Sequence, residues 1–164
     1  MEQDYAALPY IITNIAAIVT AIIAMLWPTV SRVLLSIIFV GAFAFNVFTA
    51  WMNPSAYLEF GELSSNQFYR SIILGPFSLH VTLYVWMIAF CQLLIGVFTL
   101  YQGKLMKVAM IGGITFLLAI SPLGYGAAFP APMIMSLAFI ILLTKRIRFN
   151  IYDIIYHKTS YSNR

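Results

Sequence analysis

Two amide side chains are the strongest candidates for chemistry in this chain, because each lies within a long apolar stretch. Gln92 is near the middle of the charge-free run 81–101, and Asn46 lies in the preceding apolar run. An amide buried in hydrocarbon without a hydrogen-bond partner costs several kcal/mol. The two amides therefore either bond each other between helices, which is worth roughly 0.6 to 2 kcal/mol and fixes packing, or anchor a ligand in an apolar pocket. Thr115 and Ser121 could join either arrangement.

A second group of polar side chains is predicted to lie together at the outer face of the membrane: Glu59, Glu62, His80 and Tyr125. His80 either pairs with one of the two glutamates and titrates near neutral pH, or is an ordinary interfacial histidine. The stretch SPLGYGAAFP, which contains Tyr125, is predicted to form a re-entrant outer mouth or a tight outer hairpin.

The sequence lacks the residues that most catalytic and cofactor-binding sites need. The predicted spans contain no Asp, and their one Lys, Lys107, lies in the first turn of 105–123. None of them therefore has the mid-membrane Lys or Asp that a proton relay or a Schiff base would need. The two histidines, His80 and His157, are predicted on opposite sides of the membrane and so cannot share a haem iron. Cys91 is the single cysteine, which excludes an intrachain disulfide and a CxxC motif. We therefore expect no metal site, no cofactor on this chain and no autonomous enzymatic activity.

The composition indicates that these residues belong to a membrane protein. The chain has 164 residues, of which 62% are hydrophobic and 9% are charged, whereas soluble domains carry about 25% charged residues. The net charge of +4 comes from basic residues near the ends of apolar runs and in the C-terminal tail. This placement is typical of membrane topology, so we expect a lipid bilayer as partner and no nucleic acid.

The apolar runs predict an all-α, polytopic membrane bundle of five transmembrane helices, at residues 9–27, 31–51, 81–101, 105–123 and 129–144. The last two spans share one long charge-free run, which Pro122, Pro130 and Pro132 divide because no straight helix tolerates them. Residues 53–77 are too polar to span and too aromatic for a free loop. We expect them to lie in the membrane interface and to fold back over the bundle.

The positive-inside rule favours an N-terminus outside and a C-terminus in the cytoplasm, because every Lys and Arg except Arg70 then lies on the inner side. The chain is predicted to comprise an N-terminal transmembrane helix (1–28), a membrane bundle (29–144) and a basic amphipathic tail (145–164). Lys145, Arg146 and Arg148 in that tail are expected to contact anionic lipid headgroups. A stop-transfer collar with a frayed end is the alternative.

The segments RVLLSIIFVGAFAFNVF, NPSAYLEF and FCQLLIGVFTLYQGKLMKVAMIGGI follow one another within residues 32–143. In this order they resemble the DoxX-like family of small bacterial membrane proteins, with its arginine-led first helix, its NP..Y-like turn and its helix of the form xELxGGxxLLxGxxx+. Gly96 and Lys104 match that pattern. Gln92 stands where the family usually has Glu, and Asn46 where it often has Lys, so this chain carries neutral amides at both positions.

The resemblance implies a four-helix bundle in the bacterial plasma (inner) membrane, to which residues 1–28 add one span. It also implies association with quinone-linked or thiol-linked redox complexes, as a partner subunit. We therefore expect a non-catalytic integral membrane protein that acts as a subunit or scaffold, with a protein partner or a second copy of itself. The alternative is a binder or carrier of a hydrophobic molecule such as a quinone or lipid, with a pocket around Asn46 and Gln92.

Overall fold

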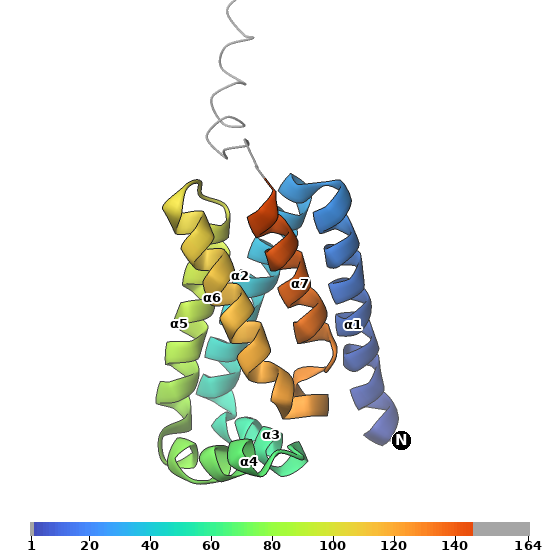
Figure 1. The fold of residues 1–164 in the computed structure, drawn as a ribbon. Coiled ribbons are helices and arrows are strands. Elements are labelled where there is room, and N and C mark those ends of the chain that lie inside the picture. The colour runs from blue at the N-terminus through green and yellow to red at the C-terminus, as the bar shows by residue number, and fades with distance from the viewer. Residues whose placement is uncertain (1, 146–164) are drawn as a thin grey trace, which may run out of the picture.

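The computed structural model describes residues 2–145 as a helical bundle with no strand in that range, which confirms the predicted all-α class (Figure 1). Its five long helices lie along a common axis, and each runs opposite to the one before it (Figure 1). These are α1 (Glu2–Leu26), α2 (Pro28–Met52), α5 (Val81–Thr99), α6 (Lys104–Ile120) and α7 (Ala131–Thr144).

Four of the described helical segments are long and apolar enough to cross a membrane: Leu8–Leu26, Pro28–Met52, Gln67–Thr99 and Lys104–Ala127. The fifth helix, α7, is equally apolar but has 14 residues, or about 21 Å of length against a hydrocarbon core of about 30 Å. The structure thus supports a multi-span membrane protein, while the count of five spans stays a prediction.

Four short elements lie across one end of the bundle, between α2 and α5 (Figure 1): η1 (Pro54–Tyr57), α3 (Glu59–Leu63), α4 (Gln67–Leu74) and η2 (Pro76–His80). Asn66 begins α4, because its side-chain oxygen accepts hydrogen bonds from the first free backbone amides of that helix. This segment, 54–80, packs against η3 (Ser121–Ala127), the turn that connects α6 to α7. It covers the end of the bundle where α6 and α7 stop short.

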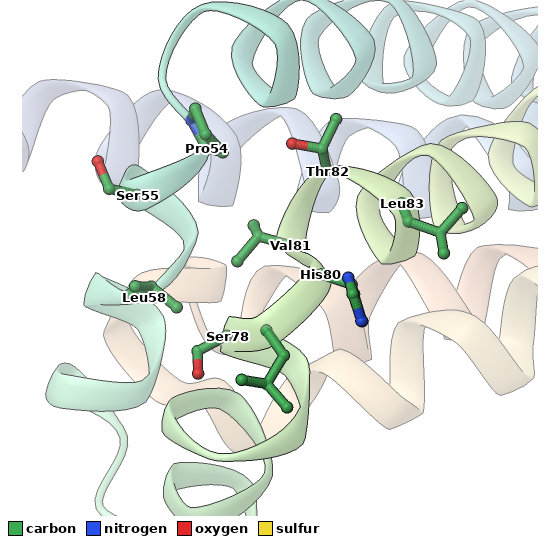
Figure 2. Close-up of a pocket in the computed structure, with 9 residues that line it drawn as sticks. Pro54, Ser55, Leu58, Ser78, His80, Val81, Thr82 and Leu83 are labelled. Atoms are coloured by element: carbon green, nitrogen blue, oxygen red, sulfur yellow. The ribbon is translucent and has the colours of Figure 1, made fainter.

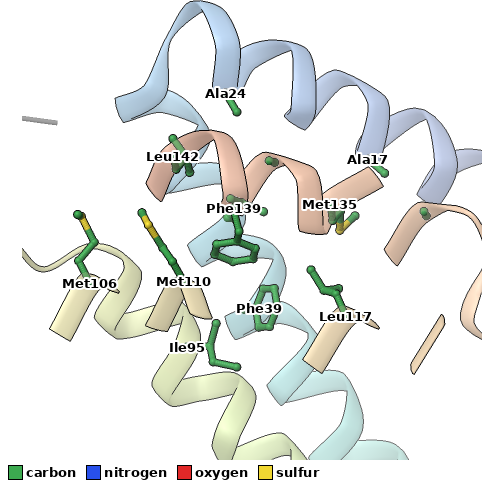
Figure 3. Close-up of a cluster of buried hydrophobic side chains, with 13 residues drawn as sticks. Ala17, Ala24, Phe39, Ile95, Met106, Met110, Leu117, Met135, Phe139 and Leu142 are labelled. Atoms are coloured by element: carbon green, nitrogen blue, oxygen red, sulfur yellow. The ribbon is translucent and has the colours of Figure 1, made fainter. Parts of the chain in front are cut away.

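One buried apolar cluster joins the N-terminal helix to the rest of the bundle (Figure 3). Ala17 and Ala24 of α1 are fully buried in this cluster, because their small side chains let α1 approach α7 closely. The rings of Phe39 and Phe139 meet edge to face at its centre, 5.5 Å apart between centroids. Gly113 of α6 provides the space, because a Cβ there would lie 2.8 Å from the Phe139 ring. The first helix therefore shares its core with the helices that follow it.

Arg32 is a structural residue as well as a topology signal. Its side chain is 3% exposed, and its Nε and Nη2 donate hydrogen bonds of 3.0 and 2.6 Å to the carbonyl oxygens of Thr99 and Tyr101. The last carbonyls of a helix have no partner within the helix, so the guanidinium caps α5 and ties it to α2. The sequence predicts only the charge at this end of the bundle.

Candidate functional site

The two amides predicted from the sequence do meet in the structure. Asn46 Nδ2 on α2 donates a hydrogen bond of 2.7 Å to Gln92 Oε1 on α5. Gly96, one turn along α5, allows this approach, because a Cβ there would lie 3.1 Å from the Ser36 carbonyl oxygen of α2. The two amides therefore bond each other between helices, as the first of the two alternatives predicts, and this bond lies beside a cavity.

Tyr57 of η1 extends the amide pair into a chain of three side chains. Its hydroxyl donates to Asn46 Oδ1 over 2.8 Å, and burial raises the pKa of this phenol above its ordinary value of 10.0. The phenol is therefore protonated at neutral pH and acts as a donor. Each group donates to the next, in the order Tyr57, Asn46, Gln92.

The last group of this chain, the Nε2 amide of Gln92, is a donor without a protein partner. Gln92 is 5% exposed, and it makes no other side-chain hydrogen bond within the part of the chain that the structure describes. Gln92 lines the cavity, and in the described residues the one polar side-chain atom that is fully buried without a partner is Asn14 Oδ1. The Gln92 N–H is therefore open to the cavity, where a bound molecule with a hydrogen-bond acceptor would pair with it.

The cavity beside Gln92 has a volume of about 340 Å³ and lies between the bundle and the segment that covers its end. Its polar lining comes from Asn46, Tyr57, Tyr69 and Gln92. The rest of the lining is largely apolar: Phe60, Ile72, Ile73, Phe77, Val85, Ile88, Phe116, Ala119, Ile120, Leu123, Gly126 and Ala127. This size and this mixture of many apolar groups with a few polar ones are typical of small-molecule sites.

Two contacts hold the covering segment over the cavity. The Tyr69 hydroxyl of α4 donates a hydrogen bond of 2.6 Å to the Ala119 carbonyl oxygen of α6. The ring of Phe60 of α3 packs on Gly126 of η3, where a Cβ would lie only 2.5 Å from Phe60 Cδ1. Segments distant in sequence are thus joined around the cavity.

The hydroxyl residues predicted to join the amides lie elsewhere. Thr115 is exposed on α6 and does not line the cavity. Ser121 is buried, but its hydroxyl donates to the Leu117 carbonyl oxygen one turn earlier, at 2.8 Å, and it does not line the cavity either. The neighbourhood of Gln92 instead uses Tyr57, which the sequence presents only as one of several interfacial aromatics. The sequence feature that could have identified Tyr57 is the NP..Y spacing from Asn53 to Tyr57.

The predicted outer-face residues do lie at one end of the bundle but form no common site. His80, Glu59 and Glu62 are exposed, and within the described residues 54–80 no hydrogen bond or ion pair joins the imidazole to either carboxylate. Tyr125 stacks on Tyr10 of α1 with ring centroids 4.9 Å apart. That contact fastens α1 to the turn between α6 and α7.

His80 lines a separate surface pocket together with residues of η1, η2 and the start of α5 (Figure 2). The hydroxyls that line it are engaged within the protein. Ser55 bonds Asn53 Oδ1, Ser78 bonds the Leu74 and Gly75 carbonyls, and Thr82 bonds the Ala50 carbonyl. The three hydroxyl protons in this pocket are therefore already donated within the protein, so His80 is the side chain there whose ring N–H remains for a ligand.

At the opposite end of the bundle, Lys145 donates a hydrogen bond to the Met25 carbonyl oxygen, beside the turn from α1 to α2. Arg146 and Arg148, the other two residues predicted to contact lipid headgroups, lie outside the described residues. No group of three His, Cys, Asp or Glu side chains that could hold a metal ion occurs in residues 2–145.

Comparison with known proteins leaves the site to be interpreted from its own geometry. No family model, curated protein or solved structure matches this chain. The DoxX-like resemblance therefore stays a prediction that rests on the short motifs quoted above. What the residues establish is a multi-helix chain compatible with an integral membrane protein, with a polar chain that ends at an apolar cavity.

Proposed function

We propose that this chain is a membrane-embedded binding protein for a hydrophobic molecule that carries a carbonyl group, such as a quinone or an ester lipid. The observation that carries the proposal is the Gln92 amide, which is 5% exposed, lines the cavity and is bonded only through its oxygen. Carbonyl oxygens accept hydrogen bonds, and the rest of the cavity is suited to an apolar body.

The chain of donors strengthens this preference for an acceptor. The Tyr57 hydroxyl polarises the Asn46 amide, which in turn polarises the Gln92 amide. Hydrogen bonds in series reinforce one another where the surroundings are apolar. The Gln92 N–H is thus a stronger donor toward the cavity than an isolated amide would be.

We further propose that the protein lies in a bacterial inner membrane, with the covering segment 54–80 on the outer side. Arg32 lies near the start of α2, Lys104 begins α6 and Lys145 follows α7, and these helix ends are at the end of the bundle opposite that segment (Figure 1). The sequence adds cations after Lys145. The positive-inside rule assigns such an end to the cytoplasm. The cavity would then open on the outer half of the bilayer, with α7 as a short fifth span.

A role as a non-catalytic subunit or scaffold, in the manner that the DoxX-like resemblance implies, stays a second hypothesis. A binding protein and a subunit of a quinone-linked assembly are compatible, because such a subunit would hold the hydrophobic molecule for a partner. In both cases we propose that the chain binds without catalysing a reaction. Stoichiometric co-purification of a partner chain, or of a second copy, tests this role.

Native mass spectrometry of the detergent-purified protein tests the binding function, with wild type, Gln92→Leu and Gln102→Leu compared. Gln102 is an exposed glutamine in the turn before α6 and serves as the matched control. We expect a stoichiometric adduct in the wild type and in Gln102→Leu that is absent from Gln92→Leu. Solvent extraction then separates the sources, because a quinone shows a redox difference spectrum and an ester lipid does not. A bare chain in all three samples, or an adduct that Gln92→Leu retains, refutes the proposal.

A further inference from the structure

A second cavity adjoins the first and meets it at Gln92. It has a volume of about 200 Å³, and both cavities are lined by Gln92, Phe116, Ile120 and Ala127. The remaining lining comes from α1, α2, α6 and α7 and includes Thr13, Ala42, Ala131 and Met135. The two cavities are therefore neighbours, and the Gln92 side chain lies where their linings meet.

The two cavities differ in chemistry. The first holds the chain of donors, whereas apart from Gln92 the second has one polar side chain, Thr13. The Thr13 hydroxyl donates to the Pro9 carbonyl oxygen of its own helix, at 2.8 Å, so it offers no free donor proton. Met135, a flexible side chain that fills irregular apolar space, also lines the second cavity. This cavity is therefore suited to a narrow hydrocarbon chain.

We propose that the ligand is a single-tailed amphiphile whose carbonyl-bearing head occupies the first cavity and whose tail passes Gln92 into the second. This inference rests on the proposed function and specifies its ligand class. It also gives α1 a role in binding: Thr13 makes α1 one wall of the tail site, and the Asn14 side chain fastens α1 to the Ala128 carbonyl oxygen at 3.1 Å.

Tail position, rather than affinity, is the decisive measurement. Lipid and detergent are as apolar as the cavity wall, so moving a tail between them gains packing contacts but little hydrophobic free energy. We therefore choose photolabelling with a benzoquinone that bears a decyl tail ending in a diazirine, and with a monoacylglycerol that carries the same diazirine-tipped tail. Labelled residues are mapped by peptide mass spectrometry in detergent.

Two pairs of variants make the test specific. Ala42→Leu fills the second cavity, and Ala44→Leu adds the same side chain on an exposed position of the same helix. Gln92→Leu removes the donor at the head, with Gln102→Leu as its control. Circular dichroism and gel filtration confirm that each variant is folded before it is labelled.

We expect label from one of the two probes on residues 131–135 and on Thr13, at least fivefold above the label on exposed α5 residues. An excess of unlabelled probe and the Ala42→Leu change should each abolish this label, whereas Ala44→Leu should retain it. A label that depends on Gln92 but falls on lipid-facing residues overturns the tail position and leaves the proposed function standing. A label that Gln92→Leu does not reduce refutes both.

Discussion

The bond between Asn46 and Gln92 gives the sharpest quantitative test of the structure, through a double-mutant cycle of Asn46→Leu, Gln92→Leu and the double variant. The two amides are joined at 2.7 Å between α2 and α5. Gln92→Leu leaves one donor of Asn46 unpaired. Asn46→Leu leaves both the Gln92 oxygen and the Tyr57 hydroxyl without their main partner, so we expect it to be the more destabilising of the two.

The magnitudes follow from general values for such bonds. Loss of a partner from a buried polar group costs about 1 to 3 kcal/mol, and interhelical hydrogen bonds in membrane bundles average about 0.6 kcal/mol with values up to about 2. We expect single-variant losses of about 1 to 2 kcal/mol. Because the double variant removes both partners together, it should lose about 1 kcal/mol less than the sum of the single losses.

The assay is reversible unfolding of delipidated protein in mixed micelles of rising SDS fraction, followed by the fluorescence of the three tryptophans. Gln102→Leu, far from the amide pair in the turn before α6, measures the effect of removing an exposed amide. A coupling free energy below about 0.3 kcal/mol would mean that the two sites are independent. That result would refute the bond and, with it, the polarised chain that aims the Gln92 amide at the cavity.

The remaining predictions concern the packing of the bundle and the phenol at the site. Arg32→Gln should destabilise the protein by about 3 kcal/mol in the same unfolding assay, because hydrogen bonds to charged groups are worth about 1.5 to 3 kcal/mol each. Its control, Arg70→Gln at an exposed position, should change stability by less than about 0.5 kcal/mol. Gly113→Ala should lower the free energy of unfolding by about 1 to 3 kcal/mol, because the added methyl overpacks the core. Gly112→Ala should be neutral or stabilising, because its Cβ would meet its nearest neighbour at 3.5 Å. Equal effects of the two changes would contradict the packing of α6 on α7. Since burial raises the pKa of the Tyr57 phenol above 10.0, the folded state holds this proton more tightly than the unfolded state. The free energy that this difference contributes to stability should be constant below about pH 10 and lost as pH rises further. In Tyr57→Phe, the unfolding free energy measured across the same pH range should not show this loss.

The class of the protein and the places of its helices were predictable from the sequence, because both depend on local composition. Runs of apolar residues between charges predict where helices begin and end, and the predicted 31–51 and 81–101 correspond to α2 and α5 within three residues at each end. Residues 53–77 were predictable as a segment that folds over the bundle, because their mixture of aromatic and charged side chains suits neither water nor hydrocarbon. Asn46 and Gln92 were identifiable as partners for a similar reason: a buried amide needs one.

What only the tertiary structure decided is which distant side chains those amides face. Tyr57 reaches Asn46 because η1 turns back over the end of α2. Thr115 instead is exposed, and Ser121 bonds back to Leu117 in the last turn of α6. Arg32 is buried because the free carbonyls at the end of α5 lie within reach, which a charge count does not show. The two cavities likewise arise from the packing of five helices and a covering segment. Local sequence determines the helices, but a cavity is a property of the space between them, and that space depends on how they pack.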